Sequence, residues 1–328
     1  MAWCNWHSVV RISKGMMEKM LSQSAHAAQT EWTQRKERSQ RPVVRFMVWF
    51  SLLLGRRISR VLLRGIALYF LLFSPKARAA LQLYYQQLWQ RRARWGELYR
   101  HFFAFSSVIH DRIFLLDGQH GQFDVRLDAS DRAVIERALQ SADGVVIWGA
   151  HFGSFEMLKA LSAQNGQTVY MLMYGDNADK LNAILAAINP QAPVHVIALN
   201  RVDSMLQAQE KLMQGHWLGM LADRTFAADE TVALPFLGKE ARFPTGPMRL
   251  AAMLGCPVLF LAGAYVQGRH YQIHARVLGD FGDCPREERA QRMAQVQQAF
   301  VQQLEAMCHC YPHNWFNFFD FWQAASER

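Results

Sequence analysis

The sequence has few charged residues for its size and, along one long stretch, almost no acidic ones. Charged residues make up 19% of its 328 residues, against 51% hydrophobic and 12% aromatic residues. This composition excludes a disordered chain, and the length is sufficient for a sizeable core in one large domain or two ordinary ones. The formal net charge is +9, and between Arg35 and Arg100 the only acidic residues are Glu37 and Glu97. Positive charge is therefore concentrated in this early part of the chain.

Cysteine is also scarce and does not form a structural framework. The five cysteines are odd in number and have no regular spacing. We therefore predict reduced thiols that face a cytosolic compartment. Cys308, Cys310 and the neighbouring histidines His309 and His313 would crowd a zinc ion, and no second pair of ligands follows at zinc-finger spacing, so no metal site is predicted.

Several motifs that would define a cofactor site or an enzyme nucleophile are missing. The sequence contains no phosphate-binding P-loop, no glycine fingerprint for dinucleotides and no Gly-x-Ser-x-Gly elbow. No cofactor is therefore predicted. Residues 1–19 also lack the charged start, apolar run and small-residue cleavage site of a signal peptide. Because Met16, Met17 and Met20 are alternative starts, we expect residues 1–41 to be a basic segment that is partly disordered or read from too early a start.

The early basic residues alternate with large apolar ones. The basic residues are Arg35, Lys36, Arg38, Arg41, Arg45, Arg56, Arg57, Arg60, Arg64, Lys76, Arg78, Arg91, Arg92, Arg94 and Arg100. A nucleic-acid-binding arm rarely carries so much aliphatic surface, so no nucleic acid is predicted as a partner. An anionic membrane surface at the cytoplasmic leaflet explains both features, because its headgroups attract arginine while apolar side chains enter the acyl boundary.

The apolar runs in this region are too short to span a bilayer individually. Residues 43–54 are interrupted by Gly55, Arg56 and Arg57, and residues 61–73 contain Arg64, whereas a spanning helix needs about 20 apolar residues. Three interpretations stay open: a helical hairpin in the membrane interface, a single tilted span, or a buried helix pair packed on the rest of the protein. We predict a helical, membrane-associating region over residues 42–118, with a break at Pro75.

From residue 119 onward the pattern changes to alternating strands and helices. Strands are expected at 123–127, 144–149, 169–173, 195–199, 217–222, 258–264 and 271–275, and helices at 128–141, 155–164, 181–188, 204–213, 248–254 and 286–307. This alternation predicts an α/β catalytic domain over residues 119–328, with a central, mostly parallel sheet flanked by helices. In such sheets the chemistry gathers at the carboxyl ends of the strands.

The most informative segment for chemistry runs from Trp148 to Glu156. A buried strand ends in small residues, His151 follows at its carboxyl end, and Glu156 lies five residues later at the start of a helix. Histidine suits a general base because its ordinary pKa is near 6.5, and a carboxylate on the other ring nitrogen fixes the tautomer. We expect His151 to be the base and Glu156 its partner. The alternative is that His151 only caps the next helix.

Two later segments could hold anionic groups. Asp223 and Arg224 end another expected strand, where the guanidinium could bind a phosphate. Residues 241–247 read as a tight loop whose amides and following helix start could hold an oxyanion, which makes Phe243, Thr245 and Gly246 candidate substrate-binding residues. The alternatives are a local salt bridge and an ordinary turn before a helix.

Together these segments resemble a known superfamily. The ordered series of His-x4-Glu, an arginine-bearing block, Phe-Pro-x-Gly and a Pro-Val strand is similar to the glycerol-phosphate and lysophospholipid acyltransferases. Within that superfamily the chain looks most like the late lipid A acyltransferases of the Gram-negative inner membrane. The resemblance covers roughly residues 30–325, and it also rests on Trp32, on residues 232–238 and on residues 311–318.

The resemblance implies an O-acyltransferase at the cytoplasmic face of the bacterial inner membrane. It would move a fatty acyl group from acyl-carrier protein or coenzyme A to a lipid hydroxyl, with His151 and Glu156 as the catalytic pair. Thr245 stands where enzymes acting on glycerol phosphate carry an acid, which favours a lipid A-type glycolipid acceptor. A lysophospholipid, another specialised lipid or a pigment stays open as the acceptor.

Two further functions remain compatible with the sequence. A non-catalytic lipid-binding membrane protein would use the same basic and apolar front, and a thioester hydrolase would use the same histidine to activate water. Convergence of His151, Glu156 and Arg224 on one cleft would favour an enzyme over a scaffold. The aromatic residues between Trp315 and Trp322 could form core, or could line an acyl tunnel.

Overall fold

The computed structural model describes residues 41–141, 143–158, 166–173, 195–199, 203–225 and 230–323, with side chains from residue 51 onward. The helices are α3 (Arg41–Phe73), α4 (Pro75–Trp89), α5 (Trp95–Leu116), η2 (His120–Gln122, a 3-10 turn), α6 (Ala129–Gln140), α9 (Ser204–Met213), α10 (Gly246–Leu254) and α11 (Arg289–Cys310). The strands are β1 (Asp124–Leu127), β2 (Val146–Gly149), β3 (Val169–Met173), β4 (Val196–Ala198), β5 (Trp217–Leu221), β6 (Thr231–Phe236), β7 (Lys239–Pro244), β8 (Pro257–Gln267) and β9 (His270–Asp280). The helix expected at 181–188 and the N-terminal segment 1–40 lie outside the described residues.

Seven strands form one mostly parallel sheet in the order β1-β9-β8-β2-β5-β3-β4. Every neighbouring pair is parallel except β8 and β9, which form a long antiparallel hairpin. The expected mixed α/β fold is therefore confirmed. The middle strands β2 and β5 pair with Gly149 opposite Leu221, so their carboxyl ends lie level with each other.

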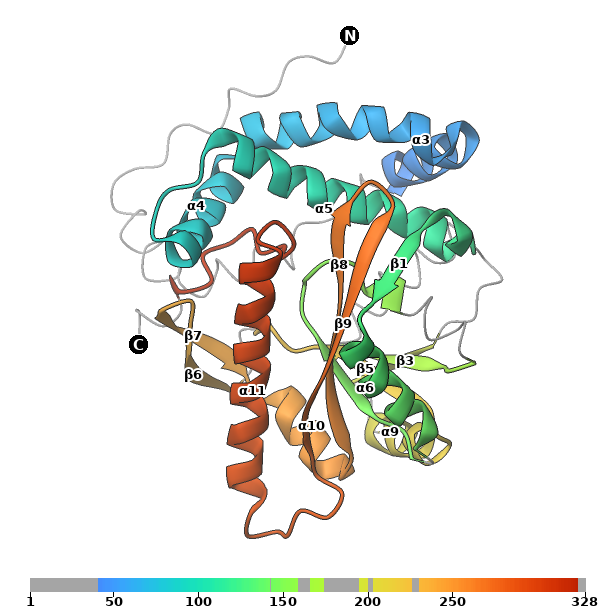
Figure 1. The fold of residues 1–328 in the computed structure, drawn as a ribbon, viewed down its shortest axis with the longest axis vertical. Helices are drawn as coiled ribbons and strands as arrows, with labels where there is room; N and C mark the ends of the chain where they lie inside the picture. The colour runs from blue at the N-terminus through green and yellow to red at the C-terminus, as the bar shows by residue number, and fades with distance from the viewer. Residues whose placement is uncertain are drawn as a thin grey trace, which may run out of the picture.

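The two faces of the sheet bury alternate residues of the same strand. On β2, Val146 and Trp148 belong to the core cluster that contains α11, where Trp148 packs edge-on against Phe300. Ile147 belongs to the cluster on the other face, together with residues of α5 and α6 such as Ile135. This alternation is what a strand covered by helices on both faces requires. Figure 1 shows α11 and α6 standing on either side of the twisted sheet.

A separate antiparallel ribbon, β6 and β7, was not expected. Residues 241–247 were interpreted as a tight loop, but Lys239–Pro244 pair with Thr231–Phe236, and α10 begins directly afterwards at Gly246. Leu237 has φ 53° and Gly238 φ 80°, the positive values typical of a two-residue hairpin turn. The ribbon was missed because its residues do not alternate cleanly between apolar and polar.

The helices α3, α4 and α5 cross one end of the sheet (Figure 1). The predicted break at Pro75 is confirmed: α3 ends at Phe73, Pro75 stands in the first turn of α4, and the side chain of Arg78 donates to the last carbonyls of α3 at Leu71 and Leu72. No single helix among the described residues is long and apolar enough to cross a bilayer. The bent pair Ser51–Phe73 and Pro75–Trp89, which meet at 89°, meets that criterion only when the two are taken together.

A buried ion pair fixes α3 to α5. Arg56 donates through Nε and Nη2 to the two carboxylate oxygens of Asp111, at 2.8 Å each, and Tyr271 of β9 donates its hydroxyl to the same carboxylate at 2.9 Å. Asp111 is fully buried. Three separate elements of the fold therefore meet at one carboxylate.

Candidate active site

The candidate site lies where two neighbouring parallel strands end. Gly149 of β2 pairs with Leu221 of β5. His151 and Asp223 each follow two residues later, so the register places them side by side at the carboxyl edge of the sheet. This level alignment brings together two side chains that are 72 positions apart in the sequence.

Asp223 holds both the ring and the backbone of His151. Its Oδ1 atom lies 2.8 Å from Nδ1 of the imidazole, and its Oδ2 atom accepts from the His151 amide at 3.0 Å. The indole Nε1 of Trp315 donates to the same Oδ2 at 3.1 Å. The Asp223 side chain is 1% exposed, whereas the His151 side chain is 30% exposed. The carboxylate is thus fixed from three directions while part of the imidazole stays accessible.

The electrostatics of this pair define which ring nitrogen can act as a base. Burial opposes ionisation of Asp223, but the neighbouring His151 and Arg224 outweigh it and lower the aspartate pKa to about 2. An ionised carboxylate only accepts hydrogen bonds, so Nδ1 of His151 must carry the ring proton. Nε2 is then the unprotonated nitrogen, and it has no hydrogen-bond partner among the described residues.

The imidazole is held in its neutral form. Burial lowers the pKa of His151 below its ordinary value of 6.5, and the nearby positive charges of Arg224 and Arg112 lower it further, while Asp223 raises it in part. Near neutral pH the ring is therefore unprotonated at Nε2. A neutral histidine with a fixed tautomer is the state that a general base requires.

Glu156 does not fill the position expected for it. The sequence pairs His151 with Glu156, but the carboxylate at Nδ1 belongs to Asp223, and Glu156 instead forms an ion pair with Arg112 of α5. The physical reason is local: Gly153 turns the chain, with φ +58°, before the helix that contains Glu156 begins, and the Glu156 side chain meets α5. The Arg112–Glu156 pair remains close enough for Arg112 to influence the pKa of His151.

Arg224 lies beside this pair as a partly buried positive charge. Its Nη2 atom donates to the carbonyl of Phe316 at 2.8 Å, and its guanidinium lies 5.6 Å from the ring centre of Phe319. Its Nε atom is buried and has no hydrogen-bond partner among the described residues. Burial lowers the pKa of Arg224, and the charge of Asp223 partly offsets that effect. The arginine thus retains one free donor in the interior of the site.

The segment after α11 forms one wall of the site. Phe316 donates its amide to the carbonyl of His151 at 2.8 Å, and Gly153 donates to the carbonyl of Asn314 at 2.9 Å. The Asn314 side chain in turn exchanges two hydrogen bonds with the backbone of Tyr265 in β8. Backbone hydrogen bonds on both sides therefore hold the His151 loop against this segment.

Gly153 is required by its surroundings. A Cβ at this position would lie 2.0 Å from the carbonyl oxygen of Gly263 in β8, and the backbone already has a positive φ. Gly263 faces the same restriction, because its own Cβ would lie 2.7 Å from the carbonyl oxygen of Ser154. Two glycines thus allow the His151 loop to approach the neighbouring strand closely.

The candidate residues of the Phe-Pro-x-Gly segment, Phe243, Thr245 and Gly246, lie in a different environment. The Phe243 ring is fully buried among Phe236, Phe300 and Phe321, so it supports the core. Thr245 bonds to the carbonyl of Glu230 through its amide and its hydroxyl, and Gly246 begins α10. Within the described residues, none of the three forms a hydrogen bond with His151, Asp223 or Arg224. Their role in substrate binding stays a prediction.

The aromatic segment near the C-terminus is mainly core. Trp315, Phe316, Phe321 and Trp322 are buried, and Trp315 packs against Phe236, Tyr84 and Phe321. The contribution of Trp315 to the site, through its indole hydrogen bond to Asp223, was not anticipated. Neither was that of Arg112. Trp315 lies within residues 311–318, on which the family resemblance partly rests, but no pattern in the sequence predicts its hydrogen bond to Asp223, and none marks Arg112 as part of the site.

A comparison with protein families identifies the family of this chain. Residues 44–324 match the family described as bacterial lipid A biosynthesis acyltransferase. The chain therefore belongs to the bacterial lipid A biosynthesis acyltransferase family and is an acyltransferase of that type. A search among curated proteins gives no match.

Proposed function

We propose that this acyltransferase moves a fatty acyl group from an acyl-carrier-protein or coenzyme A thioester to a hydroxyl of a membrane lipid. A lipid A-type glycolipid is the favoured acceptor, and the reaction takes place at the cytoplasmic face of the bacterial inner membrane. The observation that carries the proposal is the Asp223–His151 pair, with a partly exposed imidazole that is unprotonated at Nε2 and lies near the charge of Arg224.

The reaction follows from the protonation states of the site. The acceptor hydroxyl attacks the thioester carbonyl carbon while Nε2 of His151 takes its proton, so a C–O bond forms and the imidazole becomes an imidazolium. Asp223 stabilises that positive charge through Nδ1, and Arg224 offers a partly buried positive charge for the developing oxyanion. The C–S bond then breaks, and the departing thiolate receives the proton from His151. Because the acceptor oxygen is itself the nucleophile, no acyl-enzyme is required.

The same site argues against the scaffold interpretation. A non-catalytic lipid-binding protein has no need for a buried carboxylate that fixes the tautomer of a partly exposed histidine, nor for an arginine beside that pair. His151, Asp223 and Arg224 converge, and the charge of Arg112 also reaches His151. Water could replace the lipid hydroxyl in this geometry, so the test has to distinguish acyl lipid from free fatty acid.

The test is acyl transfer by the purified protein in mixed micelles. Labelled acyl-acyl-carrier protein and acyl-coenzyme A are offered in turn with a lipid A precursor or a lysophospholipid, and the products are separated as acyl lipid and free acid. We expect acyl lipid from the wild type and a loss of about 10²–10⁴-fold in His151→Ala, the size of a lost general base.

The matched control is His309→Ala, which removes an exposed imidazole at the end of α11 and should leave the rate unchanged. Equal rates in His151→Ala and the control would contradict the assignment of the base. Free acid as the main product would instead support the hydrolase.

Membrane association is supported by the outer face of α3. Its exposed large apolar residues are Leu53, Ile58, Val61, Leu62, Leu68, Tyr69, Phe70, Leu72 and Phe73. From Ile58 onward they recur at helical spacing opposite the buried side formed by Leu63, Ala67 and Leu71. A continuous exposed apolar surface of this kind is typical of membrane or protein contact.

A vesicle assay tests this part of the proposal. The triple variant Ile58→Glu, Leu62→Glu and Tyr69→Glu should bind vesicles of phosphatidylglycerol and phosphatidylethanolamine at least about tenfold more weakly, because three apolar groups are replaced by charges of the same sign as the membrane. The control replaces three apolar residues that are exposed elsewhere, Leu206, Met213 and Val277, by glutamate. Equal loss of binding in both variants, measured by co-sedimentation, would argue against α3 as the docking face.

A further inference from the structure

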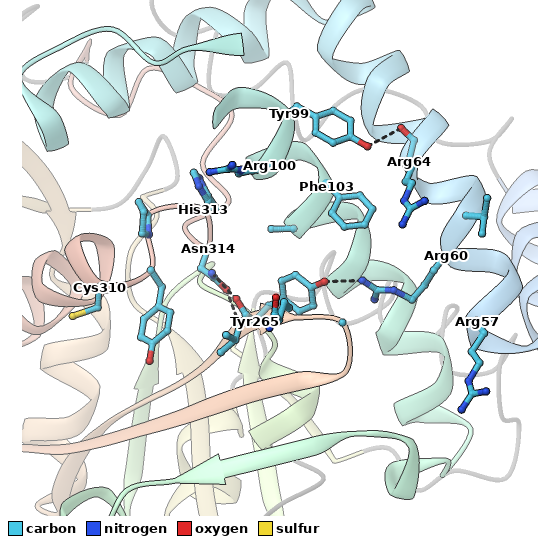
Figure 2. Close-up of a pocket in the computed structure, with 17 residues that line it drawn as sticks. Arg57, Arg60, Arg64, Tyr99, Arg100, Phe103, Tyr265, Cys310, His313 and Asn314 are labelled. Atoms are coloured by element: carbon cyan, nitrogen blue, oxygen red, sulfur yellow. Dashed lines mark hydrogen bonds between the residues drawn. The ribbon is translucent and has the colours of Figure 1, made fainter. Parts of the chain in front are cut away.

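A cavity whose lining does not include His151, Asp223 or Arg224 is rich in arginine. Its volume is about 910 Å³, and it lies between α3, α5, the tip of the β8–β9 hairpin and the segment after α11. The lining includes Arg57, Arg60, Arg64 and Arg100, and none of its 17 residues is acidic. Figure 2 shows the three α3 arginines on one side of the opening and Arg100 with His313 on the other. The volume is within the range of pockets that bind small molecules.

The α3 arginines are aligned by the period of the helix. Arg57, Arg60 and Arg64 follow one another at intervals of three and four residues, so they lie on one flank of α3, between its buried side and its exposed apolar face. The pocket therefore opens next to the surface that we propose rests on the membrane. A group attached to a membrane lipid would meet these arginines without leaving the interface.

Three of the four arginines have no counter-charge among the residues that the structure describes. Within the described part of the chain, Arg57, Arg64 and Arg100 have no carboxylate within ion-pair distance, whereas the nearby Arg56 is fully paired with Asp111. Like charges gathered in this way repel one another, so the arrangement favours an anionic ligand. Arginine forks match the geometry of phosphate oxygens in particular.

Arg60 adds a buried donor that is already oriented. Its Nη2 atom donates to the Tyr265 hydroxyl at 2.7 Å, and its guanidinium lies over the rings of Phe103 and Tyr265 (Figure 2). Its Nη1 atom is buried, makes no hydrogen bond within the described residues and forms an ion pair with Asp111 at 3.7 Å. Tyr265 and Asp111 therefore hold the Arg60 guanidinium in place at the wall of the cavity.

The cavity also shares a wall with the candidate active site. Asn314, in the segment after α11, is part of the lining of the cavity. Its backbone carbonyl accepts a hydrogen bond from the amide of Gly153, two residues beyond His151. A ligand held in the cavity would therefore lie on the other side of the segment that supports the base. This position suits a part of a substrate that is recognised but does not react.

From these observations we infer that the arginine pocket binds a phosphate ester carried by one of the two substrates. The inference rests on the proposed acyl transfer, because it identifies the phosphate as part of the acceptor or of the donor. The two sources are a phosphate on the glycolipid acceptor, and the phosphodiester or phosphate of the pantetheine-bearing donor.

Binding is tested first, without reference to activity. Inorganic phosphate is titrated into the full-length protein by calorimetry at constant ionic strength, with chloride as the reference anion. The double variant Arg57→Gln and Arg64→Gln should raise the Kd for phosphate at least about tenfold, and both side chains are exposed and unpaired, so the fold should persist. The control, Arg286→Gln with Arg289→Gln, removes the same charge at the far end of α11 and should change the Kd less than about twofold.

Activity then identifies the source of the phosphate. If the acceptor supplies it, the Arg57 and Arg64 double variant raises the acceptor KM about tenfold with kcat nearly unchanged, and acceptor treated with phosphatase shows no such difference. If the donor supplies it, the donor KM rises instead. Either result supports the inference.

The inference is overturned if wild-type protein shows no saturable phosphate binding, if the two double variants bind phosphate equally, or if neither KM changes. Its failure is distinguishable from failure of the proposed function. His151→Ala should bind phosphate like the wild type, and a protein that binds phosphate through these arginines but makes no acyl lipid would retain the anion site and lose the acyl-transfer proposal.

Discussion

Two buried aspartates in this protein have similar surroundings and different roles. Asp111 accepts two hydrogen bonds from Arg56 and one from Tyr271, and Asp223 accepts two from His151 and one from Trp315. In both cases burial opposes ionisation and the neighbouring cations or imidazole outweigh it, so the pKa of each carboxyl is lowered.

The partners of the two aspartates make the difference. Arg56 is always charged and its side chain is 9% exposed, so its pair with Asp111 has one state and joins α3 to α5 and β9. His151 can gain or lose a proton and is 30% exposed, so its pair with Asp223 has two states and a contact with solvent. Asp111 also has a titratable neighbour, His110 at 3.7 Å, but that side chain is only 3% exposed. A buried carboxylate therefore stabilises structure when its partners are shielded from solvent, and can support proton transfer when its partner titrates and is accessible.

The largest expected difference between the two aspartates is in the effect of their substitution on catalysis. Asp223→Asn should reduce kcat/KM by about 10²–10⁴-fold, because the amide no longer fixes Nδ1 as the protonated nitrogen or stabilises the imidazolium. Acyl transfer measured in micelles, with circular dichroism as the check on folding, tests this. Asp223→Asn with wild-type kcat/KM would show that Asp223 is only structural.

The converse substitution should act on stability. Asp111→Asn leaves Arg56 and Arg60 without their counter-charge inside the protein, and loss of one partner from a buried pair costs about 3–5 kcal/mol. Urea unfolding of the micelle-solubilised protein should show this decrease in the free energy of unfolding. The fraction of Asp111→Asn that remains folded should transfer acyl groups at nearly the wild-type rate per folded molecule. A stable but inactive Asp111→Asn variant would show that Asp111, like Asp223, is needed for catalysis.

The smallest effect concerns pH. Because burial and the two arginines lower the pKa of His151 below 6.5, the acidic limb of kcat/KM should have its midpoint below that value. The sign for stability is the same: the folded state favours neutral His151, so its contribution is present above pH 6.5 and is lost as the pH falls. Arg112→Gln removes one positive charge and should move the limb toward higher pH. Arg126→Gln, at an exposed position on β1, is the control, and equal limbs in both variants would show that Arg112 does not act on His151.

The sequence predicted the parts of this protein that depend on local patterns. Strands such as 169–173, the break at Pro75 and the position of His151 at the end of a strand all follow from residues that are neighbours in the chain. The identity of the carboxylate beside His151 does not. Glu156 is close in sequence, whereas Asp223 becomes adjacent only because β5 pairs with β2, and strand order is not encoded in any local period.

The same reason explains the other residues that the sequence did not reveal. Arg112 comes from α5 and Trp315 from the segment after α11, and both reach the site through packing between distant elements. The sequence showed that the early part of the chain is basic. It did not show that Arg56 forms an ion pair with Asp111 whereas Arg57 and Arg64 line the cavity, because this depends on which side of α3 faces Asp111.

The close approach of Gly153 to Gly263 has a consequence for protein engineering. A designer who transplants His151 and Asp223 onto another parallel sheet would naturally copy β2 and β5, the strands that lead into these two residues. The loop would not keep its shape there, because it rests on the backbone of β8 at a distance that no side chain allows. A portable unit of this chemistry therefore has to include β8 as well, because Gly263 offers its carbonyl to the Ser154 amide and has no side chain at the point of contact.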